Sequence, residues 1–186
     1  MGFFRGFIAI DIEPFPILEN FQQDIKKTGA NVKLVEPENI HITLKFLGDT
    51  PEKQIDDIND IISSSVAEIE PFEIIMRGAG VFPNESYLKV VWVGITPVDT
   101  IASISKTLDE KLASLGFKRE KKNFSPHLTI GRVRSARNKN ELIKVIEKYK
   151  DLTFNSFKVS SIKLKKSQLT SQGPIYSNLK EILLGS

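Results

Sequence analysis

The chain contains two histidines in 186 residues, and each is followed two positions later by a threonine. The first opens the segment His41-Ile42-Thr43-Leu44, and the second opens His127-Leu128-Thr129-Ile130. Polar and apolar residues alternate in both segments. This is the period of a half-buried strand, so each histidine shares a strand face with its threonine. The sequence therefore predicts two pairs of an imidazole and a hydroxyl.

Two imidazoles favour acid–base chemistry on a phosphodiester, because a side chain with a pKa of about 6.5 supplies both protonation states near neutral pH. One ring would take a proton from the attacking oxygen while the other gives a proton to the departing oxygen. Thr43 and Thr129 would donate hydrogen bonds to the nonbridging phosphate oxygens, where charge gathers in the transition state. Arg132, five residues after His127, would add a permanently charged contact.

Two other interpretations of these residues stay open. A catalytic zinc site has three protein ligands, and without cysteine or His-x-x-x-His spacing only carboxylates could complete it. Alternatively, each histidine is structural and each threonine is a β-branched strand residue. The repetition of one motif around the only two histidines favours acid–base catalysis, and we expect no metal and no cofactor.

The composition is typical of a globular protein, with 40% hydrophobic and 26% charged residues. No apolar run is long enough to span a membrane, and the N-terminal segment has no signal-peptide cleavage pattern. The absence of cysteine is typical of cytosolic proteins. We therefore expect a cytoplasmic protein that does not associate with membranes.

The net charge of +3 hides an asymmetry between the two halves of the chain. Residues 1–93 hold 8 Lys and Arg against 15 Asp and Glu, whereas residues 94–186 hold 18 against 8. The second half is thus suited to an anionic partner such as RNA, although a solvated surface would look similar. Its basic clusters are Lys118, Arg119, Lys121 and Lys122; Arg132, Arg134, Arg137 and Lys139; and Lys163, Lys165 and Lys166.

Hydrophobic periodicity and turn residues predict a mixed α+β chain. The expected strands are 3–12, 32–35, 40–46, 72–77, 87–95, a short one from Phe117, 124–133, 157–164 and 175–184. The expected helices are 17–27, 51–69, 99–115 and 140–149. The order strand, helix, strand with a histidine, helix occurs twice. It suggests two lobes whose histidine strands face each other across a cleft, a preferred place for a ligand.

Further segments accompany the two motifs and carry a resemblance over nearly the whole chain. They are Phe7-Ile8-Ala9-Ile10-Asp11, residues 38–48, Gly80-Val81-Phe82-Pro83, Leu115-Gly116-Phe117, residues 124–132, residues 164–169 and Gly173-Pro174-Ile175-Tyr176. Together they resemble the 2H phosphoesterase superfamily, and within it the RNA 2′,3′-cyclic phosphodiesterase branch, historically called 2′-5′ RNA ligase.

The resemblance implies an α+β fold of two pseudo-symmetric lobes, with antiparallel sheets flanked by helices and a central cleft that carries both motifs. No linker divides the chain, so we expect residues 1–186 to form one bilobal domain, and a monomer. The implied activity is metal-independent hydrolysis of RNA 2′,3′-cyclic phosphate ends to a 2′-phosphate, with tRNA fragments among the candidate substrates.

The resemblance also assigns roles by position. His41 would be the proton donor to the O3′ leaving group, and His127 would be the proton acceptor that activates water. Thr43 and Thr129 would hold phosphate oxygens and Arg132 would contact the phosphate. Phe46 would stack on the terminal base. Two alternatives remain: a noncatalytic RNA-binding module that uses the basic second half, and reversible joining of RNA ends through a 2′-5′ linkage.

Overall fold

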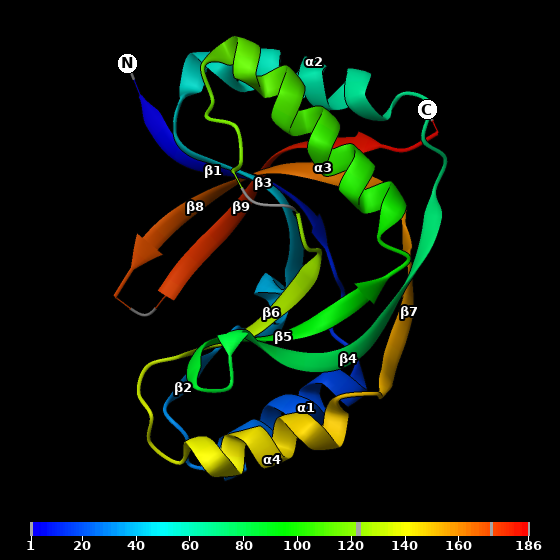
Figure 1. The fold of residues 1–186 in the computed structure, drawn as a ribbon. Coiled ribbons are helices and arrows are strands. Elements are labelled where there is room, and N and C mark those ends of the chain that lie inside the picture. The colour runs from blue at the N-terminus through cyan, green and yellow to red at the C-terminus, as the bar shows by residue number, and fades with distance from the viewer. Residues whose placement is uncertain (1, 122–123, 172, 186) are drawn as a thin grey trace.

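The computed structural model describes residues 2–121, 124–171 and 173–185. Within them, nine strands form one antiparallel sheet, and four α-helices cover it (Figure 1). The strands are β1 (Phe3–Asp11), β2 (Val32–Leu34), β3 (His41–Pro51), β4 (Phe72–Asn84), β5 (Tyr87–Thr96), β6 (His127–Val133), β7 (Thr153–Val159), β8 (Ser161–Thr170) and β9 (Gly173–Leu183). The helices are α1 (Pro16–Lys27), α2 (Ile55–Val66), α3 (Asp99–Leu112) and α4 (Lys139–Tyr149).

The strands follow the order β7-β4-β5-β6-β3-β1-β8-β9, and β2 pairs with β6. We call β7, β4, β5, β6 and β2 with helices α1 and α4 the first lobe. We call β3, β1, β8 and β9 with helices α2 and α3 the second lobe. In the first lobe α1 contacts α4 and α4 lies on β4, and in the second lobe α2 contacts α3 and α3 lies on β3 (Figure 1). The expected α+β fold, with two lobes of antiparallel strands flanked by helices, is confirmed.

Each helix pair combines segments that are distant in the sequence. Helix α1 follows β1 of the second lobe but packs in the first, and α3 follows β5 of the first lobe but packs in the second. The inward face of α1 carries Leu18, Phe21 and Ile25, which are fully buried at helical spacing. The inward face of α3 also buries two polar residues, Ser105 and Asp109, which contact β3.

Three sequence predictions about strands are wrong. Residues 78–84 continue β4 rather than forming a loop, because residues 79–84 pair with β5, whereas β7 pairs with β4 only as far as Arg77. Beyond that point β4 is an edge strand on the side of β7. Pro83, which has no backbone N–H, therefore costs no hydrogen bond to a strand on that side. Phe117 begins no strand, and the expected strand 157–164 is two strands in different lobes. The alternating apolar residues of 157–164 do not reveal that one strand ends at Val159 and the next begins at Ser161.

Several element boundaries also differ from the predictions, and two of them concern the histidine strands. The helix expected from Pro51 begins at Ile55, because β3 continues to Pro51 and a 3-10 turn at Glu52–Gln54 follows it. The second histidine strand begins at His127 rather than at Phe124. Among the described helices, none has the length and apolar character needed to cross a membrane.

Candidate active site

The two histidine motifs lie on neighbouring strands at the centre of the sheet. Strands β3 and β6 pair through Ile42 and Leu128, the residues between histidine and threonine in each motif. Because the strands are antiparallel, this register places His41 beside Thr129 and Thr43 beside His127. Both central residues are fully buried, so the polar residues occupy the opposite face. The expected imidazole and hydroxyl pairs thus form a single group of four side chains.

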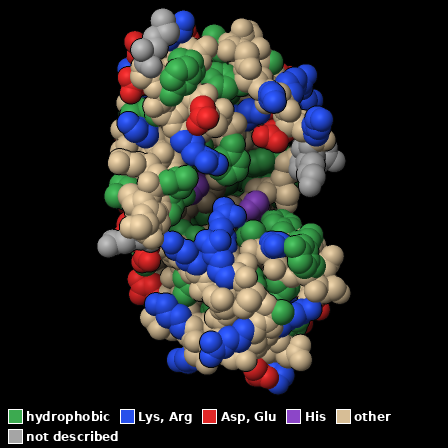
Figure 2. All heavy atoms as spheres, turned by 90° about the vertical axis from the view of Figure 1, so that its left-hand side faces the viewer, with side chains coloured by type: hydrophobic (Ala, Val, Ile, Leu, Met, Phe, Trp, Pro, Cys, Tyr) green, Lys and Arg blue, Asp and Glu red, His purple; other side chains and the backbone are tan. Residues whose placement is uncertain are grey.

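The junction of the lobes differs from the expected strands that face each other across a cleft. Beyond Leu128 the same edge of β6 pairs with β2, while β3 continues along β1, so the two strands separate after their one contact. Figure 2 shows a hollow between the lobes in which both histidine side chains are visible, with Lys and Arg side chains gathered around it. The motifs form the floor of this cleft rather than its two walls.

The two imidazole rings are oriented in the same way. Nδ1 of His41 lies 2.7 Å from the carbonyl oxygen of Asn39, and Nδ1 of His127 lies 2.7 Å from that of Ser125. A carbonyl oxygen only accepts hydrogen bonds, so Nδ1 carries the proton in both rings. Nε2 is then the nitrogen that accepts a proton in a neutral ring and donates one in a charged ring. Each histidine presents this single reactive nitrogen to chemistry.

Equivalent β-bulges follow both motifs. In β3, Thr43 pairs with Ala9 but Lys45 pairs with Ile8, so Leu44 is an extra residue. In β6, Thr129 pairs with Trp92 but Gly131 pairs with Val91, which makes Ile130 the extra residue. A bulge shifts the alternation by one. Residues five positions after each histidine, Phe46 and Arg132, therefore return to the face of the histidines, although in a regular strand they would point away.

Arg132 and Phe46 both lie near His41. The guanidinium of Arg132 is close enough to lower the pKa of His41, although the two residues come from different lobes. The Phe46 side chain is 62% exposed, and its ring centroid lies 6.5 Å from that of Phe7, which itself lies 5.0 Å from the His41 ring. The structure thus brings together all six residues that the sequence singled out.

Aromatic residues that the sequence analysis did not assign to the site surround both histidines. Phe7 and Tyr176 contact the His41 ring at centroid distances of 5.0 and 5.4 Å. Phe82 contacts the His127 ring at 5.1 Å and also packs on Trp92. Phe7 and Tyr176 belong to segments that carry the family resemblance, but apolar composition alone suggested only a buried strand. Their positions become informative only in the folded sheet, where β1 pairs with β3 and the order β3-β1-β8-β9 joins β9 to the same lobe.

The charges around His41 oppose one another. Burial lowers the pKa of His41, and the cationic side chains of Lys165 and Arg132 lower it further. The hydrogen bond to Asn39 and the Asp11 carboxylate act in the other direction. Burial also raises the pKa of the Tyr176 hydroxyl, against the influence of Arg132 and Arg5. The cleft is therefore both enclosed and cationic on the side of His41.

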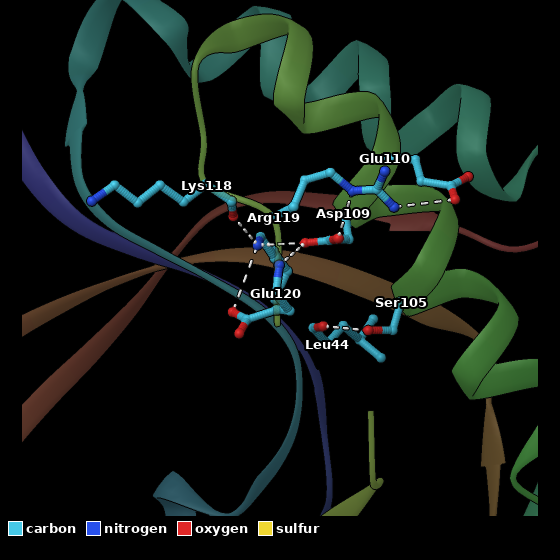
Figure 3. A network of polar contacts seen from close by, with 8 residues as sticks. Leu44, Ser105, Asp109, Glu110, Lys118, Arg119 and Glu120 are labelled. Atoms are coloured by element: carbon cyan, nitrogen blue, oxygen red, sulfur yellow. Dashed lines mark hydrogen bonds and ion pairs between the residues drawn. The ribbon is translucent and has the colours of Figure 1, made fainter. Parts of the chain in front are cut away.

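A buried lysine anchors the loop that precedes the second motif (Figure 3). Lys45 directly follows the bulge in β3, and its ammonium donates to Asp109 at 2.7 Å and to the carbonyl of Lys118 at 2.6 Å. The Asp109 carboxylate also accepts the backbone N–H of Glu120 at 2.9 Å. Ser105 of α3 donates to the carbonyl of Leu44 at 2.7 Å. These contacts fasten residues 118–120 to β3, a short distance along the chain from His127.

The three basic clusters are not equivalent. The side chains of Lys118, Arg119 and Lys121 are exposed, as are those of Arg132, Arg134 and Arg137, whereas Lys122 lies outside the described residues. In the third cluster, Lys163 and Lys165 form ion pairs with Asp11. The described residues include no group of three or more His, Cys, Asp or Glu side chains that could hold a metal ion.

Comparison with known proteins identifies similar sequences along most of the chain. Residues 11–169 match the family described as the 2′-5′ RNA ligase superfamily. A Methanocaldococcus jannaschii protein named RNA 2′,3′-cyclic phosphodiesterase is 46% identical over 180 residues, which cover 95% of this chain and 99% of that protein. A protein of the same name from Methanothermobacter thermautotrophicus is 39% identical over 178 residues, covering 95% and 96%.

The fold is also similar to those of solved structures. A Thermus thermophilus protein superposes with a TM-score of 0.79 at 24% identity, covering 97% of each chain. LigT of Escherichia coli, crystallised with 3′-AMP, superposes with a TM-score of 0.75 at 22% identity over the full length of both chains. At these identities the likeness concerns the fold.

Proposed function

Because this chain belongs to the 2′-5′ RNA ligase superfamily, we propose that it hydrolyses the 2′,3′-cyclic phosphate ends of RNA to a 2′-phosphate with its two histidines. The observation that carries the proposal is the pairing of β3 and β6 through Ile42 and Leu128. It joins His41 and His127 in one site, with both Nδ1 atoms engaged by carbonyl oxygens. The similar proteins named RNA 2′,3′-cyclic phosphodiesterase support the choice of substrate.

In the proposed reaction, Nε2 of His127 takes a proton from water as the water oxygen attacks phosphorus. The bond between phosphorus and O3′ breaks, and Nε2 of His41 gives its proton to O3′. The phosphate stays on O2′, and the two imidazoles exchange their protonation states. Both hydrogen bonds from Nδ1 persist through the cycle, because Nδ1 is protonated in the neutral and the charged ring alike.

Thr43, Thr129 and Arg132 would stabilise the charge that develops on the phosphate oxygens. Among the described residues, neither threonine hydroxyl has a hydrogen-bond partner, so both can donate to substrate. Arg132 adds a charge that does not depend on pH. Phe46 offers an exposed ring beside Phe7 on which the terminal base would stack.

The donor role of His41 depends on the charge of the substrate. Burial, and in addition the protein's own cations Lys165 and Arg132, hold the pKa of His41 below its ordinary value, which disfavours the imidazolium. A cyclic phosphate carries one negative charge, and beside Arg132 it would offset these cations. Binding of the substrate would then raise the pKa of His41 and load the acid with its proton.

The decisive experiment is incubation of the protein with an RNA oligonucleotide or tRNA fragment that ends in a 2′,3′-cyclic phosphate, in excess EDTA, followed by identification of the product isomer. We expect the 2′-phosphate, a bell-shaped pH profile, and loss of at least about 10²-fold in rate on His41→Ala or His127→Ala. Circular dichroism of each variant controls for folding. Formation of the 3′-phosphate, or a requirement for zinc after EDTA treatment, would overturn the mechanism.

The family description favours one second candidate, the joining of RNA ends through a 2′-5′ linkage. It is the same displacement with an RNA 5′-hydroxyl as the nucleophile in place of water: the bond between phosphorus and O3′ again breaks, and the two histidines serve in the same places. Water at high concentration favours hydrolysis, so ligation should be seen only with concentrated 5′-hydroxyl ends. Salt-sensitive RNA binding that survives both histidine replacements, with no turnover by the wild type, would instead indicate a noncatalytic RNA-binding module.

A further inference from the structure

A cluster of three charged residues, Asp11, Lys163 and Lys165, lies beside His41, and the reaction described above gives no role to Asp11 or Lys163. Asp11, the last residue of β1, is the register partner of His41 on β3. One of its carboxylate oxygens accepts a hydrogen bond from Lys165 at 2.5 Å, and the other accepts one from Lys163 at 3.1 Å. The Lys165 side chain is only 7% exposed. Burying an ammonium group costs free energy, so the burial of Lys165 beside the site requires an explanation.

The groups that face His41 come from five elements. They are Asp11 and Phe7 on β1, Lys165 on β8, Arg132 on β6, Tyr176 on β9 and the Asn39 carbonyl before β3. The two cations disfavour a charged imidazole, whereas the carboxylate favours it. Among the described contacts, the hydrogen bond of the His41 ring goes from Nδ1 to Asn39, and none joins the ring to Asp11, which therefore acts through its field.

The two lysines also fix the state of Asp11. Burial alone would raise the pKa of this carboxyl, but the hydrogen bonds and charges of Lys165 and Lys163 outweigh it and hold the pKa below its ordinary value. The carboxylate is consequently charged throughout the neutral pH range. Both of its oxygens are held by lysines, so the carboxylate is not free to turn toward His41. Asp11 is therefore a fixed negative charge rather than a member of a proton relay.

We propose that Asp11, clamped between Lys163 and Lys165 directly beside His41, is a positioning residue that keeps the imidazole charged enough to serve as the acid and draws the Lys165 ammonium to itself. The consequence for turnover rests on the proposed function. The effect on the protonation of His41 does not, because it can be measured without substrate. A purely structural Asp11, present only to neutralise buried lysines, would leave the titration of His41 unchanged.

The test is a proton NMR titration of the histidine rings in the whole protein. The chain has two histidines and hence two Hε1 ring signals, which His127→Gln assigns. We expect Asp11→Asn to move the midpoint of His41 to lower pH and Lys165→Met to move it to higher pH, with smaller effects on His127. A loss of packing would not move the His41 midpoint in opposite directions in the two variants, so opposite shifts indicate an effect of charge.

Glu181→Gln provides the matched control. Glu181 lies 3.7 Å from Lys163 on the side away from Asp11, so this variant removes one negative charge from the same network without touching the pair beside His41. Its His41 midpoint should stay near that of the wild type. The double variant Asp11→Asn/Lys165→Met leaves no buried charge unpaired and should titrate between the two single variants, which keeps the test usable if Asp11→Asn folds poorly.

Kinetics provide the second readout. Asp11→Asn should lower kcat about tenfold at neutral pH, and its kcat should recover toward that of the wild type as the pH is lowered. The reason is that each pH unit by which the His41 midpoint falls reduces the protonated fraction of this imidazole about tenfold. An unchanged midpoint, shifts in the same direction for both variants, or a loss of kcat that is the same at every pH would overturn the proposal. Absence of turnover in the wild type would instead reject the proposed function and leave the NMR result valid.

Discussion

His41 and His127 have similar neighbours along the chain but different neighbours in space. Both rings donate from Nδ1 to the carbonyl two residues earlier. His41, however, contacts Phe7 and Tyr176, which also contact each other, and lies beside Asp11, whereas the ring of His127 contacts Phe82. Side chains from β1, β8 and β9 therefore give His41 surroundings that His127 does not share, although the two motifs are equivalent along the chain.

The threonines give a prediction at this scale. Thr43→Val and Thr129→Val keep the β-branched shape and remove only the hydroxyl, so each should fold normally and lose about 10²-fold in kcat through one missing donor to the phosphate. Steady-state kinetics with a cyclic-phosphate RNA, compared with urea unfolding of the same variants, measure both effects. Full activity in both variants would support the interpretation of these residues as strand formers alone.

At the scale of elements, polar residues on otherwise apolar helix faces hold the site strands in place. Helix α3 presents Ser105 and Asp109 to Leu44 and Lys45 at the bulge of β3, and through Lys45 it also fastens residues 118–120 (Figure 3). The first lobe has its own polar contact, in which Asp24 of α1 accepts hydrogen bonds from Lys148 and Tyr149 of α4. One network is buried beside the catalytic strands, and the other ties two helices on the outer surface.

Lys45→Met tests whether the buried network positions His127. Removing the ammonium leaves Asp109 with weaker partners, so we expect a loss of about 2–3 kcal/mol in unfolding free energy and a fall in kcat of about tenfold with little change in KM. Urea unfolding and kinetics measure the two effects. Arg119→Gln is the control, because this 58% exposed side chain contacts the same carboxylate and should matter little. A less stable Lys45→Met enzyme with normal kcat would show that the network has no part in positioning.

Asp24 gives a prediction about acid stability. Its hydrogen bonds to Lys148, Tyr149 and Lys27 lower the pKa of the carboxyl from 3.8 to about 2. The depressed pKa means that this stabilisation is present above about pH 4 and is lost as the pH falls through about 2. Asp24→Asn should cost about 1 kcal/mol at pH 7, and this difference should disappear between pH 4 and 2.

Urea unfolding of the wild type and Asp24→Asn across that range makes the measurement. Asp56→Asn is the matched control, since Asp56 pairs with Lys180 but is 86% exposed, and it should change stability little at any pH. A difference between wild type and Asp24→Asn that persists unchanged at pH 2 would contradict the assignment.

At the scale of the whole molecule, one sheet runs through both lobes, and each lobe receives a helix from each half of the chain. Because of this exchange, packing of the helices within each lobe fixes how the two lobes are oriented relative to each other. It also distributes basic residues from the second half of the chain over both sides of the cleft. Residues 118–121 precede β6 and are fastened to β3 in the second lobe, whereas Arg134 and Arg137 follow β6 in the first lobe.

This distribution predicts a salt dependence that grows with RNA length. For an oligonucleotide with a cyclic phosphate end, kcat/KM should fall steeply with added NaCl, whereas a cyclic mononucleotide should respond weakly, because longer RNA contacts more cations. Arg134→Gln/Arg137→Gln should reduce the slope for the oligonucleotide only. Lys106→Gln/Lys158→Gln, with the same change of charge at exposed positions on α3 and β7, is the control. Equal slopes for both substrates would exclude an extended RNA contact.

Much of the site follows from the sequence by itself. Two histidines with threonines two residues later define both the residue types and the strand faces, since alternation along a strand is a local property. The helices were predictable for the same reason, as in α1, where apolar residues recur every three or four positions. The prediction failed at residues 78–84 and 153–170, where the outcome depends on which strand lies alongside.

Only the tertiary structure decided how the side chains meet. A spacing of five residues would turn Arg132 and Phe46 away from the histidines, and the bulges at Ile130 and Leu44 bring them back. The charge on Lys165 and Asp11 could be read from the sequence, but their contact across 154 residues could not. Bulges and ion pairs of this kind arise from pairing between strands that are distant in the chain. The sequence therefore determined which chemical groups are available, and strand pairing determined which of them act on His41.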